Sequence, residues 1–219
     1  MLPFLINGDF VGFLIVGLTL VVAISLHEFG HALADELQGD PTARLAGRLT
    51  VNPMRHLDPF GTLMIALVGF GWGRPVPISP PSMRNRRYGA ALVGLAGPAV
   101  NVLLALTSAL AARYMNLSLA AGVGGAGLTS TERLISAFLY INILLAVLNL
   151  IPIPPLDGSR VLGALLPPSR QHIVYFLDQW GFVILLVAAL FVLPRVLPPL
   201  ATHAELWILR LVGYPVVGA

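Results

Sequence analysis

The sequence predicts an all-α protein that crosses a lipid bilayer several times. Of its 219 residues, 57% are hydrophobic and only 11% are charged, whereas soluble domains carry roughly 25% charged residues. The apolar residues gather in several long runs, and a helix needs about 20 of them to cross the hydrocarbon core. A soluble core of this size could not hide so much apolar surface from water, so we expect a multi-pass membrane protein.

Four apolar runs are long enough to span the bilayer. The first covers residues 10–26 and continues as a helix to about residue 37. The next three are expected at 88–112, 134–151 and 173–193, and a weaker fifth at 198–212 could lie in the interface instead. No basic residue precedes the first run and no small-residue cleavage pattern follows it, so we expect a retained span rather than a signal peptide.

A long connection, residues 34–87, separates the first two spans and carries seven of the thirteen arginines. The positive-inside rule therefore predicts that this connection is cytoplasmic. Within it, residues 60–72 are apolar but short for a span, which predicts a re-entrant element or one lying along the membrane. Residues 43–51 alternate loosely around Gly47, which predicts a short strand or β-hairpin. We thus expect five to six membrane helices or segments.

The motif HEFGH, residues 27–31, follows the first apolar run. Four residues advance a helix by about 400°, so His27 and His31 project from nearly one face and can share a metal ion. Glu28 sits beside that face, where it can remove a proton from a water at the metal. Ionisable groups in an apolar helix are costly unless paired or liganded, which favours a metal site over a chance match.

A catalytic zinc site needs a third protein ligand and an open position for water. The chain contains no cysteine, which excludes thiolate ligands, disulfides and a cysteine nucleophile. The candidates for the third ligand are Asp157, His56, Asp58 and Asp178. Asp157 ends a proline-rich, stiff segment, and Gly158 permits a tight turn beside its carboxylate. If residues 60–72 do not cross the membrane, the third span also returns Asp157 to the side where His27 and His31 lie.

The pairing of HEFGH in one span with NLIPIPPLDG after a later one resembles the site-2 protease family of intramembrane zinc metallopeptidases, peptidase family M50. GPAVN at 97–101 and NPMRHLDP at 52–59 resemble its compact prokaryotic branch. The resemblance covers about residues 10–166. It implies one Zn²⁺ held by His27, His31 and Asp157, with Glu28 as catalytic base. Many members carry a PDZ or CBS domain, for which this chain has no room.

Two asparagines are weaker candidates for substrate binding. Asn149, at the end of the third span, either satisfies carbonyl groups at the helix end or, as the resemblance suggests, binds the substrate backbone or the oxyanion near the metal. Asn101 lies in mid-membrane, where its amide must be hydrogen-bonded to another helix. Packing is the favoured role for Asn101, and assistance to the active site is the alternative. Gly97 and Pro98, in the same span, are most simply interpreted as a kink that allows close approach of helices.

We therefore expect one membrane-embedded domain, residues 1–219, with a catalytic core at about 10–166 and accessory C-terminal helices at about 172–215. The expected activity is that of a zinc endopeptidase in a prokaryotic cell membrane, with its site toward the cytoplasm. Its expected partners are a transmembrane protein or peptide substrate and lipid, and a homo-oligomer is compatible with the sequence.

Two other classes of function were weighed. No arginine-rich stretch alternates with exposed aromatic residues, so nucleic-acid binding is not expected. The rival function is a metal transporter or a non-proteolytic metal-binding protein on the same scaffold. A transporter should carry further His and Asp ligands along several spans, whereas a proteolytically inactive relative should lack Glu28 or a ligand.

Overall fold

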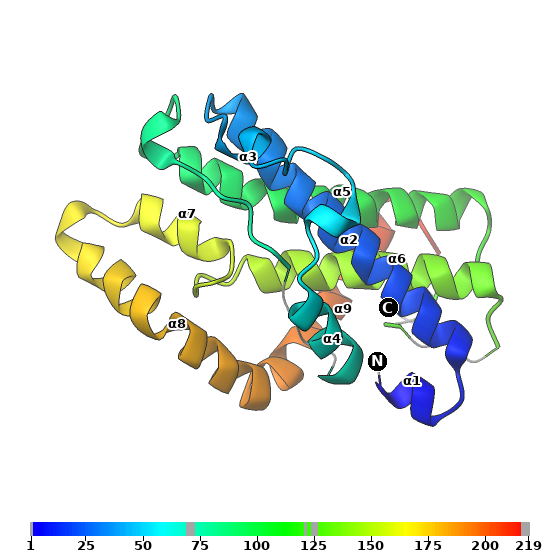
Figure 1. Ribbon diagram of the computed structural model, residues 1–219. Helices are drawn as coiled ribbons and strands as arrows, with labels where there is room; N and C mark the ends of the chain where they lie inside the picture. The colour runs from blue at the N-terminus through cyan, green and yellow to red at the C-terminus, as the bar shows by residue number, and fades with distance from the viewer. Residues whose placement is uncertain (1, 69–72, 121, 124–126, 216–219) are drawn as a thin grey trace.

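A computed structural model describes residues 2–68, 73–120, 122–123 and 127–215. Within these residues, each secondary-structure element is a helix (Figure 1). The α-helices are α1 (Leu2–Ile6), α2 (Phe10–Leu37), α3 (Thr42–Leu45), α4 (Pro59–Val68), α5 (Gly89–Tyr114), α6 (Ser130–Asn149), α7 (Gly158–Leu165), α8 (Gln171–Phe191) and α9 (Leu193–Leu211). Short 3-10 turns lie at Pro53–Arg55, Pro80–Ser82 and Pro168–Arg170. The all-α class is therefore confirmed.

Four of the described helices, α2, α5, α6 and α8, are long and apolar enough to cross a membrane. They coincide with the four runs predicted from the sequence, and α2 extends through HEFGH to Leu37 as expected. The weaker fifth segment is helix α9, which begins at Leu193 and contains three prolines, and it is not among the four. The expected five to six segments therefore reduce to four spanning helices, with α4 and α9 as further helices.

Helix α5 lies against both α2 and α6, and these three helices form the centre of the molecule (Figure 1). Small residues permit the close approach: a methyl group added to Gly30 of α2 would lie 2.8 Å from Val100 Cγ2 and 3.1 Å from Ala96 O of α5. Helix α9 packs on the far side of α5 and α6, in an apolar cluster around Leu139 and Ala105. These contacts fix the relative depth of the spans.

The predicted β-hairpin at 43–51 is wrong, because these residues form helix α3 and a following turn rather than a strand. Buried carboxylates stabilise the helical start: Asp40 Oδ1 accepts a hydrogen bond from Thr42 N at 3.1 Å, and Asp35 Oδ2 accepts one from Ala43 N at 3.3 Å. Gly47 then turns the chain with a φ of +68°. Of the apolar positions in this segment, Ala43 and Leu49 pack in a cluster with Ala32 of α2, whereas Leu45 and Val51 are exposed.

Asp40 also ties this region to the segment that precedes α5. Its second carboxylate oxygen accepts a hydrogen bond from Ser79 N, and Arg84 N donates to Gln38 O at 2.7 Å. Burial favours a higher pKa for Asp40, but the hydrogen bonds from Thr42 and Ser79 outweigh it and hold the pKa below the usual 3.8. An ionised Asp40 therefore anchors the end of α2 to the loop before α5.

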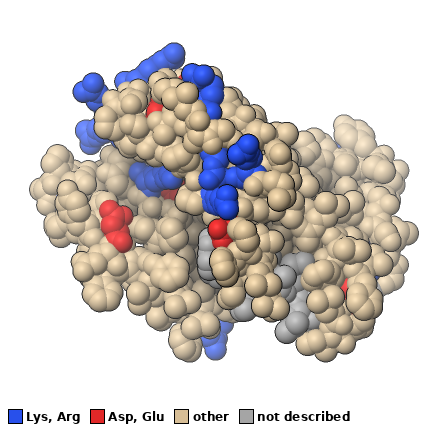
Figure 2. All heavy atoms as spheres, viewed as in Figure 1, with Lys and Arg blue, Asp and Glu red and all other residues tan. Residues whose placement is uncertain are grey.

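Helix α4 contains the described part of the apolar segment 60–72. Its ten residues rise about 15 Å, which is half of the roughly 30 Å hydrocarbon thickness. The helix is thus too short to cross, as the sequence predicted, while residues 69–72 and the predicted re-entrant path through them lie outside the described part of the chain. Arginine side chains gather over α3 and the start of α5 (Figure 2), where Arg44, Arg84, Arg86 and Arg87 are exposed.

Candidate metal centre

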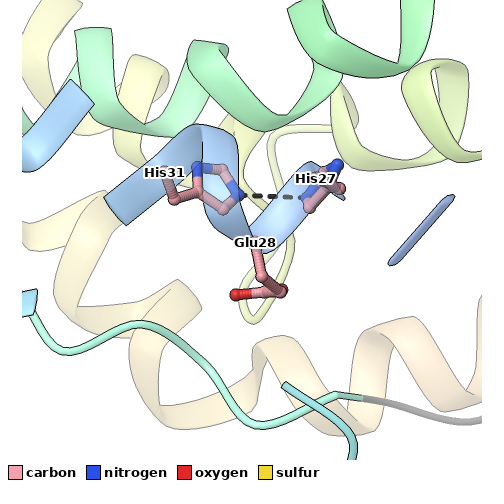
Figure 3. A group of neighbouring side chains, drawn as sticks. All are labelled: His27, Glu28 and His31. Carbon is pink, nitrogen blue, oxygen red and sulfur yellow. Dashed lines mark hydrogen bonds between the residues drawn. The ribbon is translucent and has the colours of Figure 1, made fainter. Parts of the chain in front are cut away.

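The two histidines of HEFGH lie one helical turn apart on α2 and face the same point (Figure 3). Their Nε2 atoms are 3.0 Å apart, and the rings meet nearly at right angles with centroids 4.6 Å apart. Both side chains are buried, His27 at 6% and His31 at 3% exposure. The sequence reasoning that placed both imidazoles on one face of a helix agrees with this geometry.

Asp157 reaches the two histidines from the turn that joins α6 to α7. Its Oδ2 lies 3.0 Å from His27 Nε2 and 3.1 Å from His31 Nε2. Gly158 makes the turn possible, since a Cβ there would lie 2.6 Å from Ile151 O. Residues more than 120 positions apart in the chain therefore meet at one point, as the proline-rich segment and topology predicted.

Hydrogen bonds on the far side of each ring fix which nitrogen carries the proton. His31 Nδ1 lies 2.7 Å from Val93 O, and a carbonyl oxygen can only accept, so Nδ1 donates and Nε2 keeps its lone pair. On His27, Nδ1 lies 2.6 Å from Asn101 Oδ1. Metal-binding histidines in proteins are usually oriented in this way by an acceptor on the second nitrogen.

The orientation of Asn101 is itself determined by a further asparagine, Asn142 of α6. Asn142 Nδ2 donates to Phe138 O at 2.8 Å, which turns its Oδ1 toward Asn101. Asn101 Nδ2 donates to that oxygen at 2.8 Å, which leaves Asn101 Oδ1 facing His27. Asn101 thus lies behind His27, fully buried, rather than among the residues that line the neighbouring cavity.

The donor set fits a zinc ion. Three lone-pair donors, His27 Nε2, His31 Nε2 and Asp157 Oδ2, converge with separations of 3.0–3.1 Å. With both ring protons on Nδ1, no proton lies between the two Nε2 atoms, and a shared cation would offset the repulsion between their lone pairs. Tetrahedral zinc with bonds of 2.0–2.1 Å places its ligand atoms about 3.3 Å apart, close to the spacing found here.

Glu28 occupies a different position from the three ligand candidates. A carboxylate oxygen of Glu28 lies within 4.8 Å of the imidazole nitrogens, and its side chain extends away from the rings (Figure 3). Glu28 lines a cavity of about 400 Å³ together with His27, His31 and Asp157. This position beside the histidine pair, with the carboxylate in the cavity, is compatible with a base that acts on a water at the metal.

Gly97 is a site residue that the sequence reasoning missed, because it was interpreted only as part of a kink. A Cβ at Gly97 would lie 2.5 Å from His31 Nε2 and 2.6 Å from His27 Nε2. The absence of a side chain on α5 therefore leaves the space in which the two nitrogens meet. Pro98, next in the chain, interrupts the hydrogen bonding of α5, close to Val93, whose carbonyl binds His31.

The remaining sequence candidates lie as follows. Asn149 lines the cavity, while its Nδ2 donates to Leu145 O of its own helix at 3.0 Å. His56 is fully buried and its Nε2 bonds Thr50 O at 2.7 Å, which fixes the loop. Asp58 Oδ1 caps Gly61 N, and Asp178 is exposed on α8. The structure brings none of the last three to the histidine pair.

Comparison with known proteins identifies the family. The model described as peptidase family M50 matches residues 124–188. YwhC of Bacillus subtilis, named as a zinc metalloprotease, is 38% identical to this chain over 181 residues. The matched residues cover 81% of this chain and 80% of YwhC. The chain belongs to peptidase family M50. The resemblance found in the sequence motifs is thereby confirmed.

Two mycobacterial proteins named Rip2, also named as zinc metalloproteases, are similar to this M50 chain. The Mycolicibacterium smegmatis protein is 35% identical over 80% of this chain and 66% of its own length. The Mycobacterium tuberculosis H37Rv protein is 37% identical over 76% of this chain and 63% of its own length. The chain thus spans somewhat under two thirds of these two relatives. No solved structure is significantly similar to it.

Proposed function

We propose that this M50 chain is a zinc endopeptidase that hydrolyses peptide bonds of membrane-spanning substrates. Membership of a peptidase family and relatives named as zinc metalloproteases support this activity. The observation that carries it is the position of Asp157 Oδ2, 3.0 and 3.1 Å from the Nε2 atoms of two histidines on a helix long and apolar enough to span a bilayer.

In this proposal His27, His31 and Asp157 hold one zinc ion and Glu28 is the catalytic base. Zinc, when bound, polarises the scissile carbonyl and lowers the pKa of a water molecule. The bonds from His27 to Asn101 and from His31 to Val93 O keep both Nε2 lone pairs directed at the ion. They hold the rings in place, so that binding the ion requires little rearrangement.

Glu28 moves the proton in the reaction. Its carboxylate accepts a proton from the water as the water oxygen attacks the carbonyl carbon. The C–N bond of the resulting tetrahedral adduct then breaks, and Glu28 delivers that proton to the departing amine nitrogen. Its side chain lines the cavity beside the three ligands, which suits both transfers.

The substrate reaches the site through the cavity, whose other walls are apolar. Leu145 and Leu148 of α6 line one side, and Phe182 and Leu185 of α8 line another. Such a surface suits an apolar segment drawn from the bilayer. Asn149 lies on the same wall, and its Oδ1 is the acceptor we assign to a substrate backbone N–H.

We place the site toward the cytoplasm of a bacterial cell. The exposed arginines gather over α3 and the start of α5 (Figure 2), at the end of the molecule toward which α2 carries its histidines. The positive-inside rule assigns such an end to the cytoplasm. The compared relatives are bacterial proteins.

The test compares the wild-type protein with Glu28→Gln, both reconstituted in lipid vesicles with candidate single-span substrates. We expect the wild type to cleave and Glu28→Gln to lose about 10²–10⁴-fold of the rate, while both bind zinc. Equal cleavage by the two proteins would remove the assignment of Glu28. Zinc uptake into vesicles without proteolysis would favour the transporter instead, although the described ligand candidates converge at one point rather than along a path.

A further inference from the structure

Arg160 has no role in the mechanism above, yet it lines the same cavity as the proposed reacting groups. It occupies the first turn of α7, three residues after Asp157. Among the described residues that line the cavity, it is the one arginine, and Glu28, His27 and His31 line the same cavity. A permanently charged guanidinium in a mostly apolar cavity is costly unless something compensates its charge.

One nitrogen of the Arg160 guanidinium is buried without a partner. Within the described part of the chain, Nη1 is shielded from solvent and makes no hydrogen bond. Buried polar groups in native proteins nearly always have a partner, and an exception calls for an explanation such as a catalytic or ligand-binding role. Because Arg160 lines the substrate cavity, a polar atom of the substrate is a candidate for the missing acceptor.

The position of the Arg160 side chain is set by close packing between α7 and α5. A methyl group added to Gly94 of α5 would lie 3.2 Å from Arg160 Cβ and 3.3 Å from its Cδ. The same methyl group would lie 3.0 Å from Asp157 O. The aliphatic part of Arg160 and the backbone of Asp157 therefore both pack against Gly94. This shared contact fixes the Arg160 side chain relative to the turn that carries Asp157.

The other described donors near Arg160 each make at least one hydrogen bond within the protein. The Nδ1 protons of His27 and His31 bond Asn101 and Val93 O, and Asn149 Nδ2 bonds a carbonyl of its own helix. Ser159 Oγ, beside Arg160, donates to Leu156 O at 2.7 Å. Among the described side chains that line the cavity, Arg160 is the charged donor and its Nη1 has no partner, whereas the neutral Asn149 amide keeps one of its two protons free.

We propose that Arg160 is a catalytic residue that donates to the carbonyl oxygen of the scissile peptide bond. This inference rests on the proposed protease function. When the water oxygen bonds to the carbonyl carbon, the carbonyl π electrons move to the oxygen and give it a negative charge. A prepositioned guanidinium stabilises that charge, and it releases the oxygen when the carbonyl re-forms and the C–N bond breaks.

The test uses Arg160→Gln and Arg160→Lys in the full chain, with Arg170→Gln as the matched control, because Arg170 is exposed and does not line the cavity. We expect Arg160→Gln to lower kcat about 10²–10³-fold, the loss typical of one oxyanion donor, with KM within about threefold. Arg160→Lys should recover part of kcat, since it restores the charge but not the planar donor pair. Arg170→Gln should behave as wild type.

Two further measurements separate a catalytic role from a structural one. Zinc content and the affinity for a phosphinic peptide, whose anionic oxygens resemble the charged transition state, are measured for each variant. We expect unchanged zinc content and a phosphinic-peptide affinity that falls in parallel with kcat. Loss of zinc, or kcat within threefold of wild type, overturns the inference. Failure of the wild type itself to cleave would instead reject the proposed function.

Asp35 offers the one competing structural explanation that the contacts suggest. Its carboxylate is fully buried, its Oδ1 lacks a partner among the described residues, and the charge of Arg160 is close enough to attract it. If Arg160 served only to neutralise Asp35, the double variant Arg160→Gln with Asp35→Asn should regain activity. We expect the double variant to stay as slow as Arg160→Gln, and recovery to the wild-type rate overturns the inference.

Discussion

Helices α2, α5 and α6 differ from α8 in how much of their apolar surface the protein covers, although all four are apolar enough to cross a membrane. In the most apolar 18 residues of each helix, 33–44% are buried in α2, α5 and α6, against 11% in α8. Lipid solvates apolar side chains, so apolar surface alone does not drive a membrane helix to pack against its neighbours. The three central helices must therefore associate for another reason.

The buried residues of the two regions show what that reason is. Residues His27, Asn101 and Asn142 are buried and hydrogen-bonded across α2, α5 and α6, whereas the buried residues of α8 are Gly181 and Leu185. Polar contacts and small residues hold the centre together, and they also orient the proposed metal ligands. Helix α8 forms one wall of the cavity but contributes none of these polar contacts.

The largest expected effect comes from filling the gap between α5 and the histidines. Gly97→Ala should lower zinc affinity more than about 100-fold, because the added methyl group would meet the Nε2 atoms of His27 and His31. This loss exceeds the roughly 10–100-fold that is typical when a metal ligand loses its hydrogen-bond partner. Zinc affinity is measured by competition with a chelator. Gly163→Ala in α7 is the control, since a methyl group there meets nothing within 4 Å. Normal zinc binding by Gly97→Ala would show that the helices are less tightly fixed than described.

A smaller effect should follow loss of the asparagine pair. Asn101→Ala removes the acceptor on His27 Nδ1 and should lower zinc affinity about 10–100-fold. Asn142→Ala acts through Asn101, so its loss should be smaller. Ser108→Ala is the control, because Ser108 Oγ bonds only Leu104 O of its own helix. The order Asn101, Asn142, Ser108 is the prediction, and equal effects of all three would contradict it.

The comparison also predicts different effects on stability. Leu139 of α6 is fully buried. Leu139→Ala should lower the unfolding free energy by on the order of 2 kcal/mol, because the shorter side chain leaves a cavity and loses packing contacts. Leu186 of α8 is 45% exposed, and Leu186→Ala should cost less than about 0.5 kcal/mol. Unfolding in mixed micelles by added denaturing detergent measures both. Equal costs would mean that α8 is as firmly packed as the centre.

The smallest expected effect concerns the carboxylate at the end of α2. Asp40 has a lowered pKa in the folded protein, so its ionised form contributes stability at pH above about 3.8, the unfolded value. That contribution is lost as pH falls through the lower folded value. Asp40→Asn should cost about 1 kcal/mol at pH 7, and the difference from wild type should shrink below pH 3.8. A difference that stays constant with pH would reject this role.

The spans and the meeting of His27, His31 and Asp157 could be predicted from the sequence because their signals are local or family-wide. An apolar run fixes a membrane helix by its length alone, and the spacing of His27 and His31 fixes a shared helix face. The hairpin at 43–51 could not be judged in the same way. Its loose alternation is compatible with a strand and with a short helix. The helix forms because buried Asp35 and Asp40 accept hydrogen bonds from the backbone at its start, and no sequence pattern reveals those contacts.

The supporting residues could not be read from the sequence, because their roles depend on distances between helices. Asn101 was expected only to need a partner, and the sequence does not reveal that this partner is His27. Gly97 was assigned to a kink, since nothing local indicates that two imidazoles lie 2.5–2.6 Å from its missing Cβ. Arg160 stands three residues after Asp157, but only the structure reveals that it lines the same cavity as Glu28.

The central claim is that one zinc ion joins helix α2 to the turn before α7. Zinc-edge X-ray absorption on the purified, zinc-loaded protein tests it most directly, with Asp157→Ala measured beside the wild type. The wild type should show two imidazole nitrogens and a carboxylate oxygen at about 2.0–2.2 Å, and Asp157→Ala should lose the carboxylate signal. An unchanged spectrum in Asp157→Ala, or a zinc shell without imidazole, would contradict the account.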